Sequence, residues 1–154
     1  MYRFSMGGMI KKMKIGIKGI HFDAAHYTLG SESKCESLHG HTFELDVELE
    51  GDVDESTGMI MDFAELKKLV KEVISEYDHK VIVPKEHLNQ TVLSGKFKTE
   101  IKVLDSPHAT TEYIALSILS ELRKKVRGRI SIRLYEGRNN YVEVSTDDLE
   151  QSLS

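Results

Sequence analysis

The sequence has 154 residues, of which 40% are hydrophobic, with one cysteine and a formal net charge of −4 at pH 7. These values predict one compact domain with a substantial core, and they exclude an internal disulfide and a disordered chain. The acidic balance argues against duplex nucleic acid as the main partner, because phosphate binding needs a basic surface.

No stretch approaches the roughly 18 apolar residues of a membrane span. The start of the chain, Met1 to Met13, lacks the apolar run of a signal peptide. The single cysteine suits a reducing compartment, so we expect a cytoplasmic protein without a membrane partner. Lysines gather near the start, where they form a solvated edge or help to bind an anionic substrate: Lys11, Lys12, Lys14 and Lys18.

Two strands are predicted in the first third of the chain. The segment from Ile15 to His26 alternates in polarity, but its apolar phase slips near Gly19, which indicates a bulge. The segment from His41 to Glu50 alternates without interruption, so one face is apolar and the other is polar. The first face carries His41, Phe43, Leu45, Val47 and Leu49.

Two amphipathic helices are predicted next, each with apolar residues at helical spacing on one face. The first runs from Asp62 to about Tyr77, with Asp62 as its N-terminal cap. The second runs from about Thr111 to Lys125, with Thr110 or Thr111 as its cap. The expected buried faces are Phe63, Leu66, Leu69, Val70, Val73, Ile74 and Tyr77 in the first helix, and Ile114, Ile118, Leu119 and Leu122 in the second.

Two further segments are expected to lie at the periphery. Residues 85–105 predict an inserted hairpin, formed by Val92 to Val103 around a turn at Ser94-Gly95. The tail from Asp147 to Ser154 is polar and is expected to fray. The core of the single domain therefore covers about residues 14–145.

Two short strands complete the predicted fold. Alternating apolar residues mark them at 130–134 and 141–144. The order strand-strand-helix-helix-strand-strand predicts an α+β fold, with the helices packed on one face of the sheet. Such a small sheet has two open edges, and open edges pair with other copies, so we also expect an oligomer.

Three of the seven histidines are placed as metal ligands would be. His39 and His41 lie at i and i+2 on one face of a beginning strand, about 6.6 Å apart along it. His26 ends the other strand in phase with its apolar residues, so it points into the same buried region. A catalytic zinc site commonly takes three protein ligands, for which neutral imidazole is suitable. The alternatives are a His-x-His pair that binds nothing and a core histidine at position 26.

Three other residues are candidates for proton transfer. Cys35 lies in a polar loop four residues before His39, and a nearby cation would lower the pKa of its thiol. Asp78 precedes His79 directly, and a carboxylate beside an imidazole can orient it. The alternatives are a small buried hydrophobe at Cys35 and a histidine that interacts with the dipole of the preceding helix.

Glu136 shares the inward parity of the apolar residues in its strand. A carboxylate at such a position must find hydrogen-bond donors, since desolvation is otherwise costly. Neighbouring arginines could supply them: Arg129, Arg133 or Arg138. Alternatively, the carboxylate accepts the paired N–H groups of a planar heterocycle in a bidentate hydrogen bond.

Taken in order, these residues resemble the 6-pyruvoyl-tetrahydropterin synthase family, which includes the 6-carboxy-tetrahydropterin synthases of queuosine biosynthesis. The resemblance covers about residues 14–145. It is most specific at the Cys-x-x-x-His-Gly-His element with Ala-Ala-His upstream. The matching segments are Phe22–His26, Cys35–His41, Gly58–Phe63, Asp78–His79, Thr110–Glu112 and Glu136.

The resemblance implies a T-fold, in which a four-stranded antiparallel sheet with two helices on one face joins other copies in an oligomeric barrel. The usual assembly is a homohexamer of two stacked trimers, with sites at the subunit interfaces. It implies 7,8-dihydroneopterin triphosphate as substrate, with zinc binding and acidifying the hydroxyls of its side chain. The protein would then be a zinc-dependent lyase.

The resemblance also implies a role for each matching residue. Zinc is held by three histidines, a thiolate removes a side-chain proton, and an Asp-His pair exchanges protons on the other face. In this sequence the zinc ligands match His26, His39 and His41, the thiol matches Cys35, and the pair matches Asp78 and His79. The residues that anchor the pterin ring match Glu136, Thr110, Thr111 and Glu112.

The product depends on the branch of the family. The three residues between Cys35 and His39 resemble the carboxy-tetrahydropterin branch, whereas the pyruvoyl branch has a longer spacing. Glu36, two residues before His39, resembles a third branch, in which glutamate replaces the cysteine and the product is 6-hydroxymethyl-dihydropterin of the folate-type pathway. A chain with both residues is compatible with two activities, unless Glu36 is only an exposed loop carboxylate.

The sequence departs from the family pattern in two places. Gly137 follows Glu136 where the family usually has threonine, which bears on the ring contacts. The segment from Lys80 to Ser106 is longer than in compact members and would reshape the pocket mouth or the trimer contacts. Two non-catalytic alternatives remain on the same scaffold: a metal- or pterin-binding module, and an oligomer with a structural zinc, which would normally need four protein ligands.

Overall fold

A computed structural model describes residues 12–151 of the chain. The strands are β1 (Lys12–His26), β2 (His39–Asp52), β3 (Lys80–Pro84), β4 (Ile101–Leu104), β5 (Arg129–Glu136) and β6 (Asn140–Ser145). The α-helices are α1 (Phe63–Ile74), α2 (Thr111–Lys125) and α3 (Thr146–Gln151), and two short 3-10 helices are η1 (Lys34–Glu36) and η2 (Lys85–Gln90). No helix in the described range is long and apolar enough to cross a membrane.

The sheet has six strands in the order β4-β3-β1-β2-β5-β6. The four strands β1, β2, β5 and β6 pair antiparallel, as the sequence predicted. The prediction of a purely four-stranded antiparallel sheet is wrong, because β3 and β4 extend it in parallel orientation. Only Ala24 and Ala25 of β1 pair with β3, so the rest of that edge of β1 has no partner strand within residues 12–151.

The structure also bears on two peripheral predictions, of which the hairpin is wrong. Residues 85–105 do not form a hairpin: β3 and β4 run parallel, and the segment between them holds η2 followed by residues without strand pairing. The first part of the tail that was expected to fray is helical as α3, where Asp148 accepts a hydrogen bond from the backbone N–H of Ser145, 2.8 Å away. Residues 152–154 and Lys11 of the lysine cluster lie outside the described residues, whereas Lys12, Lys14 and Lys18 are exposed on β1.

The β1–β2 pair has the bulge that the sequence predicted. Its register shifts between Ile17 and Ile20, and Gly19 adopts a positive φ of 75° that favours glycine. Beyond the bulge, even-numbered residues of β1 and odd-numbered residues of β2 face the core. Phe22 therefore lies opposite Phe43 with the two rings stacked, and both side chains are buried.

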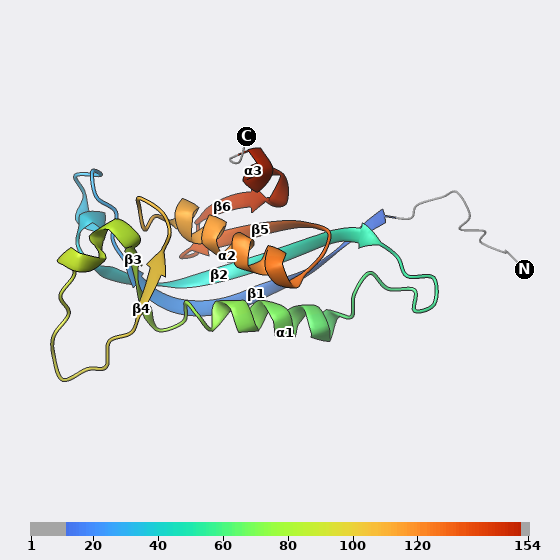
Figure 1. Cartoon of the computed structure of the whole chain (residues 1–154), viewed down its shortest axis with the longest axis horizontal. Helices are drawn as coiled ribbons and strands as arrows, with labels where there is room; N and C mark the ends of the chain where they lie inside the picture. The colour runs from blue at the N-terminus through green and yellow to red at the C-terminus, as the bar shows by residue number, and fades with distance from the viewer. Residues whose placement is uncertain (1–11, 152–154) are drawn as a thin grey trace, which may run out of the picture.

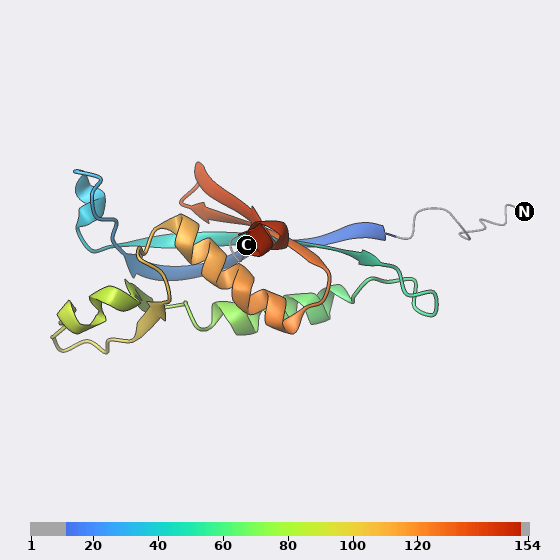
Figure 2. The ribbon, with the colours of Figure 1, turned by 45° about the horizontal axis from the view of Figure 1, so that its top comes forward.

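Helices α1 and α2 cover one face of this sheet (Figures 1 and 2). Asp62 caps α1 by accepting backbone hydrogen bonds from Ala64 and Glu65, and Thr110 caps α2 by accepting one from Tyr113. The predicted buried faces are correct except at Phe63, the first residue of α1, which is 59% exposed, and at Leu69, which is only partly buried. The helices thus close the apolar core over β1 and β2, and the histidines lie where β1 ends and β2 begins.

Tyr77 follows α1 and is fully buried, with its hydroxyl 2.6 Å from the Ser117 hydroxyl of α2. Burial raises the pKa of Tyr77 to about 12, above the ordinary value near 10. Its contribution to stability is therefore complete below pH 10 and is lost as the pH rises toward 12, by up to roughly 3 kcal/mol. Urea unfolding at pH 8 and pH 11.5 should detect this loss.

Tyr77→Phe is the matched control. It should lower the free energy of unfolding by about 1 kcal/mol at pH 8, because the Ser117 hydroxyl loses its partner. Its stability should then change less between pH 8 and pH 11.5 than that of the original chain. Equal alkaline losses in the two proteins would contradict this account.

Candidate active site

The ends of β1 and β2 bring three imidazoles together. His26 lies opposite His39 in the antiparallel register, and His41 follows two residues later on the same face as His39. The ring centroids are 4.8 Å apart for His26 and His39, 5.2 Å for His26 and His41, and 4.7 Å for His39 and His41. With Glu136 of β5, each of these residues offers a ligand atom within 4.8 Å of the others.

Backbone carbonyls fix the orientation of two of the rings. Nδ1 of His26 lies 2.7 Å from the carbonyl of Ala109, and Nδ1 of His39 lies 2.6 Å from the carbonyl of Ser37. Nδ1 must carry the proton in each ring to donate to a carbonyl, which leaves the lone pair on Nε2. The sequence analysis missed both carbonyls, since a backbone acceptor carries no residue-type signal.

The cluster has the properties of a metal site. Nε2 of His26 and Nε2 of His41 are buried without a hydrogen-bond partner. Buried ring nitrogens without a hydrogen bond are costly unless something else satisfies them, and a cation at the centre, bound by the histidines and by the Glu136 carboxylate, would do so. Burial, the largest effect, also lowers the pKa of His26 below 6.5, although the Ala109 carbonyl and Glu136 oppose this shift. The ring is therefore held in the neutral form that binds metals.

Glu136 closes the fourth side of the cluster. Its Oε1 is 3.0 Å from Nε2 of His41, and its Oε2 is 3.8 Å from Nε2 of His26. The Thr111 hydroxyl donates a hydrogen bond to the same carboxylate. Glu136 lies two residues after the buried Leu134, so the alternation of β5 directs its side chain to the same inward face. Its carboxylate can act as a fourth metal ligand or as an acceptor for a bound heterocycle.

The other predicted ring contacts are placed differently. Thr110 serves as the cap of α2, and Glu112 is exposed in the first turn of that helix. Within the part of the chain that the structure describes, Thr111 is the one residue of this stretch whose side chain donates a hydrogen bond to the histidine–glutamate cluster. Gly137 has a φ of +73°, so the turn between β5 and β6 favours glycine where the family usually has threonine.

Asp78 and His79 form a second cluster at the edge of β1. Oδ1 of Asp78 lies 2.9 Å from Nδ1 of His79 and accepts the backbone N–H of Asp23, 3.0 Å away. The backbone N–H of His79 in turn donates to the carbonyl of Asp23 at 2.6 Å. His79 has a φ of +60° and a side chain that is 76% exposed, so it faces solvent rather than the histidine–glutamate cluster of its own chain.

Asp23 belongs to this second cluster and was given no role in the sequence analysis. Its carboxylate accepts a hydrogen bond from Thr42, and its ligand atoms lie within 4.8 Å of those of Asp78 and His79. The alternation of β1 places it on the face opposite to Phe22, Ala24 and His26. That parity, read together with the motif around it, is the signal that could have identified it.

Cys35 and Glu36 lie together in η1 but face different surroundings. Cys35 is a free, exposed cysteine whose backbone N–H is capped by Ser33. The carboxylate of Glu36 instead accepts the backbone N–H of Gly30 at 2.9 Å. The structure thus gives Glu36 a role in holding the loop and leaves the thiol free.

A family model described as 6-pyruvoyl tetrahydropterin synthase matches residues 16–147. The chain belongs to this family. It is 36% identical over 133 residues to the 6-carboxy-5,6,7,8-tetrahydropterin synthase of Haemophilus influenzae, covering 82% of this chain and 94% of that protein. It is 39% identical over 126 residues to the dihydroneopterin monophosphate aldolase of Pyrococcus furiosus, covering 80% and 90%.

Solved structures share the fold. The 6-pyruvoyl tetrahydropterin synthase of Plasmodium vivax superimposes with a TM-score of 0.71 at 21% sequence identity, covering 88% of this chain and 98% of that one. The curled six-stranded sheet with its helices is thus a 6-pyruvoyl tetrahydropterin synthase-like fold, consistent with a T-fold. Family membership identifies this member as an enzyme, a pterin synthase-type lyase.

Proposed function

We propose that this chain is a zinc-dependent lyase of the 6-carboxy-tetrahydropterin synthase type, converting 7,8-dihydroneopterin triphosphate in a queuosine-type deazapurine pathway. The observation that carries the proposal is the cluster of His26, His39 and His41, in which two buried Nε2 atoms make no hydrogen bond and only the Glu136 carboxylate lies beside them. Three neutral imidazoles are a common zinc ligand set that leaves a position for substrate. The relative from H. influenzae, which bears the name of this activity, supports the choice of branch.

Each candidate residue then has its own role in the proposed reaction. A metal ion held by the three histidines would supply Lewis acidity to the hydroxyls of the substrate side chain. Cys35, as thiolate, removes a side-chain proton, and His79 with Asp78 exchanges a proton on the opposite face. Glu136 accepts N–H groups of the pterin ring and keeps the reacting carbon in place.

The arrangement of the two clusters favours a site shared between copies. His79 is exposed and lies in the cluster of Asp23 and Asp78, whereas His26 and His41 face the helix-covered side of the sheet. Strand β6 and most of the outer side of β1 are unpaired edges among the described residues. We propose that these edges join in a homohexamer of two stacked trimers, where His79 of one copy serves the metal of another.

A second product is supported by one comparison. The relative from P. furiosus is named dihydroneopterin monophosphate aldolase. The alternative activity is therefore cleavage of a dihydroneopterin side chain to 6-hydroxymethyl-dihydropterin, with Glu36 as its base. The hydrogen bond from Gly30 to the Glu36 carboxylate favours the loop role instead. Conversion to the pyruvoyl product is the third alternative.

The experiment that decides among these activities is product identification. Zinc-loaded protein is incubated with 7,8-dihydroneopterin triphosphate and, separately, with the monophosphate, and the products are identified by mass spectrometry. A 6-carboxy product supports the proposal, and a 6-hydroxymethyl product supports the alternative. Absence of turnover with both substrates would leave a metal- or pterin-binding module and would remove the proposed activity.

Glu136 distinguishes a catalytic site from a closed structural one. If its carboxylate binds the pterin, Glu136→Gln should keep about one zinc per chain and raise KM roughly 10- to 100-fold, because a charge-assisted bidentate bond is lost. Zinc content by elemental analysis and steady-state kinetics are the measurements. Loss of zinc from this variant would indicate a fourth protein ligand and a structural site.

A further inference from the structure

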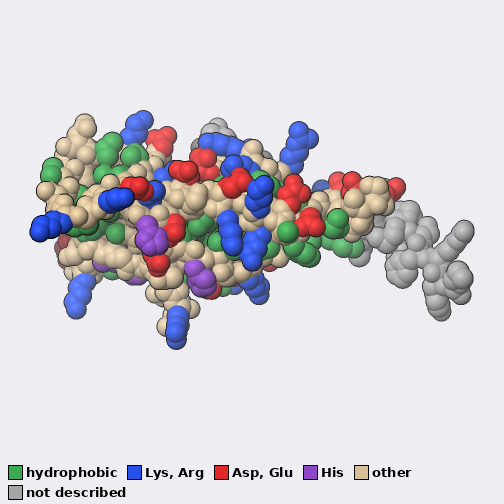
Figure 3. Space-filling model, turned by 90° about the horizontal axis from the view of Figure 1, so that it is seen from below, with side chains coloured by type: hydrophobic (Ala, Val, Ile, Leu, Met, Phe, Trp, Pro, Cys, Tyr) green, Lys and Arg blue, Asp and Glu red, His purple; other side chains and the backbone are tan. Residues whose placement is uncertain are grey.

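A basic cavity lies between the bulge of β1 and helix α1, away from the histidine cluster. Its volume is about 450 Å³, and its cations are Lys18, Lys67 and Lys71, with His21 beside them. Asp78 forms part of the same wall. Figure 3 shows this side of the molecule, where Lys and Arg side chains (blue) and His side chains (purple) lie near one another over the middle of the face.

Helix α1 and the bulge of β1 bring the three lysines to the cavity. Lys67 and Lys71 are one helical turn apart on the exposed face of α1, and like charges at this spacing destabilise a helix. Lys18 lies within the bulge, between the paired residues Ile17 and Ile20, where a strand re-aims its side chains. None of the three forms an ion pair among residues 12–151, whereas Lys80, Lys124 and Lys125 all pair with glutamates: Glu100, Glu121 and Glu72.

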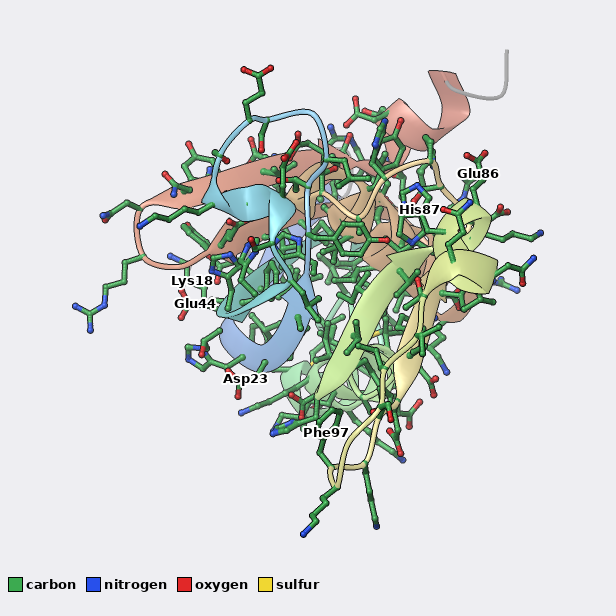
Figure 4. All side chains as sticks on the ribbon, turned by 90° about the vertical axis from the view of Figure 1, so that its left-hand side faces the viewer. Lys18, Asp23, Glu44, Glu86, His87 and Phe97 are labelled. Atoms are coloured by element: carbon green, nitrogen blue, oxygen red, sulfur yellow. The ribbon has the colours of Figure 1, made fainter. Side chains whose placement is uncertain are left out.

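The acidic side chains near this cavity already have hydrogen-bond or ion-pair partners. Asp78 accepts the backbone N–H of Asp23 and contacts His79. Glu44 lies 3.5 Å from Nε2 of His21, and Asp46 accepts the backbone N–H of Gly19. Figure 4 draws Lys18, Glu44 and Asp23 on the same side of the β1 ribbon. Three lysines face one lining carboxylate, so the cavity is positive in a chain whose net charge is −4.

We propose that this cavity binds the phosphate chain of the pterin substrate. The inference rests on the proposed function, because the pair Asp78–His79 is there assigned to proton transfer on the substrate side chain. Asp78 belongs both to that pair and to the cavity wall, so a side chain that reacts beside His79 extends its phosphates toward the three lysines. Ammonium groups act as point charges for phosphate oxygens. The cavity therefore belongs to the same active site as His79, and the metal of that site can be held by another copy of the chain.

The direct test uses inorganic triphosphate as the probe. Isothermal titration calorimetry of the zinc-loaded full chain should show binding that weakens about tenfold in Lys67→Ala and in Lys71→Ala, and more in the double variant. Binding should also weaken as salt is raised. Lys68→Ala is the matched control, since Lys68 is an equally exposed neighbour on α1 that does not line the cavity. Equal effects of Lys67→Ala and Lys68→Ala would overturn the proposal.

Kinetics link the cavity to the substrate. Lys71→Ala should raise KM for the triphosphate substrate about tenfold and change kcat less than twofold, whereas Lys68→Ala should change neither appreciably. Inorganic triphosphate should inhibit competitively against the phosphorylated substrate; noncompetitive inhibition would place the anion elsewhere and refute the assignment. If the enzyme turns over no pterin, the proposed function fails, and the calorimetric comparison alone still decides whether this cavity binds phosphate.

Discussion

His39→Ala should lose its bound metal and, with it, the reaction. Removing one of three imidazoles is expected to weaken zinc binding at least about 100-fold, since even residues that only orient a ligand contribute 10- to 100-fold. The turnover number should fall about 10³-fold, because the Lewis acid supplies several kcal/mol to the transition state. Elemental analysis after dialysis against a chelator and steady-state kinetics measure the two effects. His39 is preferable to His26, which is 1% exposed and whose loss would disturb the core.

The control is a histidine outside the cluster. His108 is exposed, and its ring contacts that of Tyr113, so His108→Ala should retain about one zinc per chain. Circular dichroism of both variants checks that the fold is intact. Full zinc content in His39→Ala would contradict the three-histidine site, because the remaining donors His26, His41 and Glu136 would then be sufficient.

Cys35→Ala should lower kcat about 10²- to 10⁴-fold while leaving zinc content and KM nearly unchanged. This reduction in kcat is the one expected when a general base is lost. The loop should not be disturbed, because the exposed thiol makes no side-chain hydrogen bond among the described residues. Glu36→Gln is the paired variant. Its amide oxygen can still accept the N–H of Gly30, so the loop should persist and the 6-carboxy product should form within about threefold of the original rate.

Product analysis of the two variants also tests for a second activity. Selective loss of a 6-hydroxymethyl product in Glu36→Gln would show that the carboxylate acts as a base rather than as a loop acceptor. Loss of both products in equal measure in Cys35→Ala would argue that one residue serves both reactions. A Cys35→Ala protein with undiminished kcat would remove the thiol from the mechanism.

The locally encoded parts of this protein were predictable from the sequence. The unbroken alternation from His41 to Glu50 defined β2 and its buried face, and the phase slip near Gly19 defined the bulge of β1. Helix α2 was placed correctly because its cap and its apolar spacing are both local signals. The three histidines could be grouped for the same reason, since strand parity fixes which side chains share a face.

The parts that depend on contacts between distant segments were not predictable. Strands β3 and β4 pair in parallel across a 16-residue separation that holds η2, and no local periodicity distinguishes this from a hairpin. Glu36 was predicted as a candidate base, and only the structure shows that its carboxylate accepts the backbone N–H of Gly30. A sequence pattern reports only on residues that are near one another in the chain, so it could not predict these contacts.

The sequence by itself determined the secondary structure of the core, the set of candidate metal-binding side chains and the resemblance to the family. Only the tertiary structure decided how those side chains are oriented and partnered. The carbonyl of Ala109 holds His26 across 83 residues of chain, and Lys18 meets Lys67 and Lys71 only because α1 packs beside the bulge of β1. The physical reason is that periodicity records which face of an element is apolar, whereas pairing and hydrogen bonding between elements are fixed only when those faces pack together.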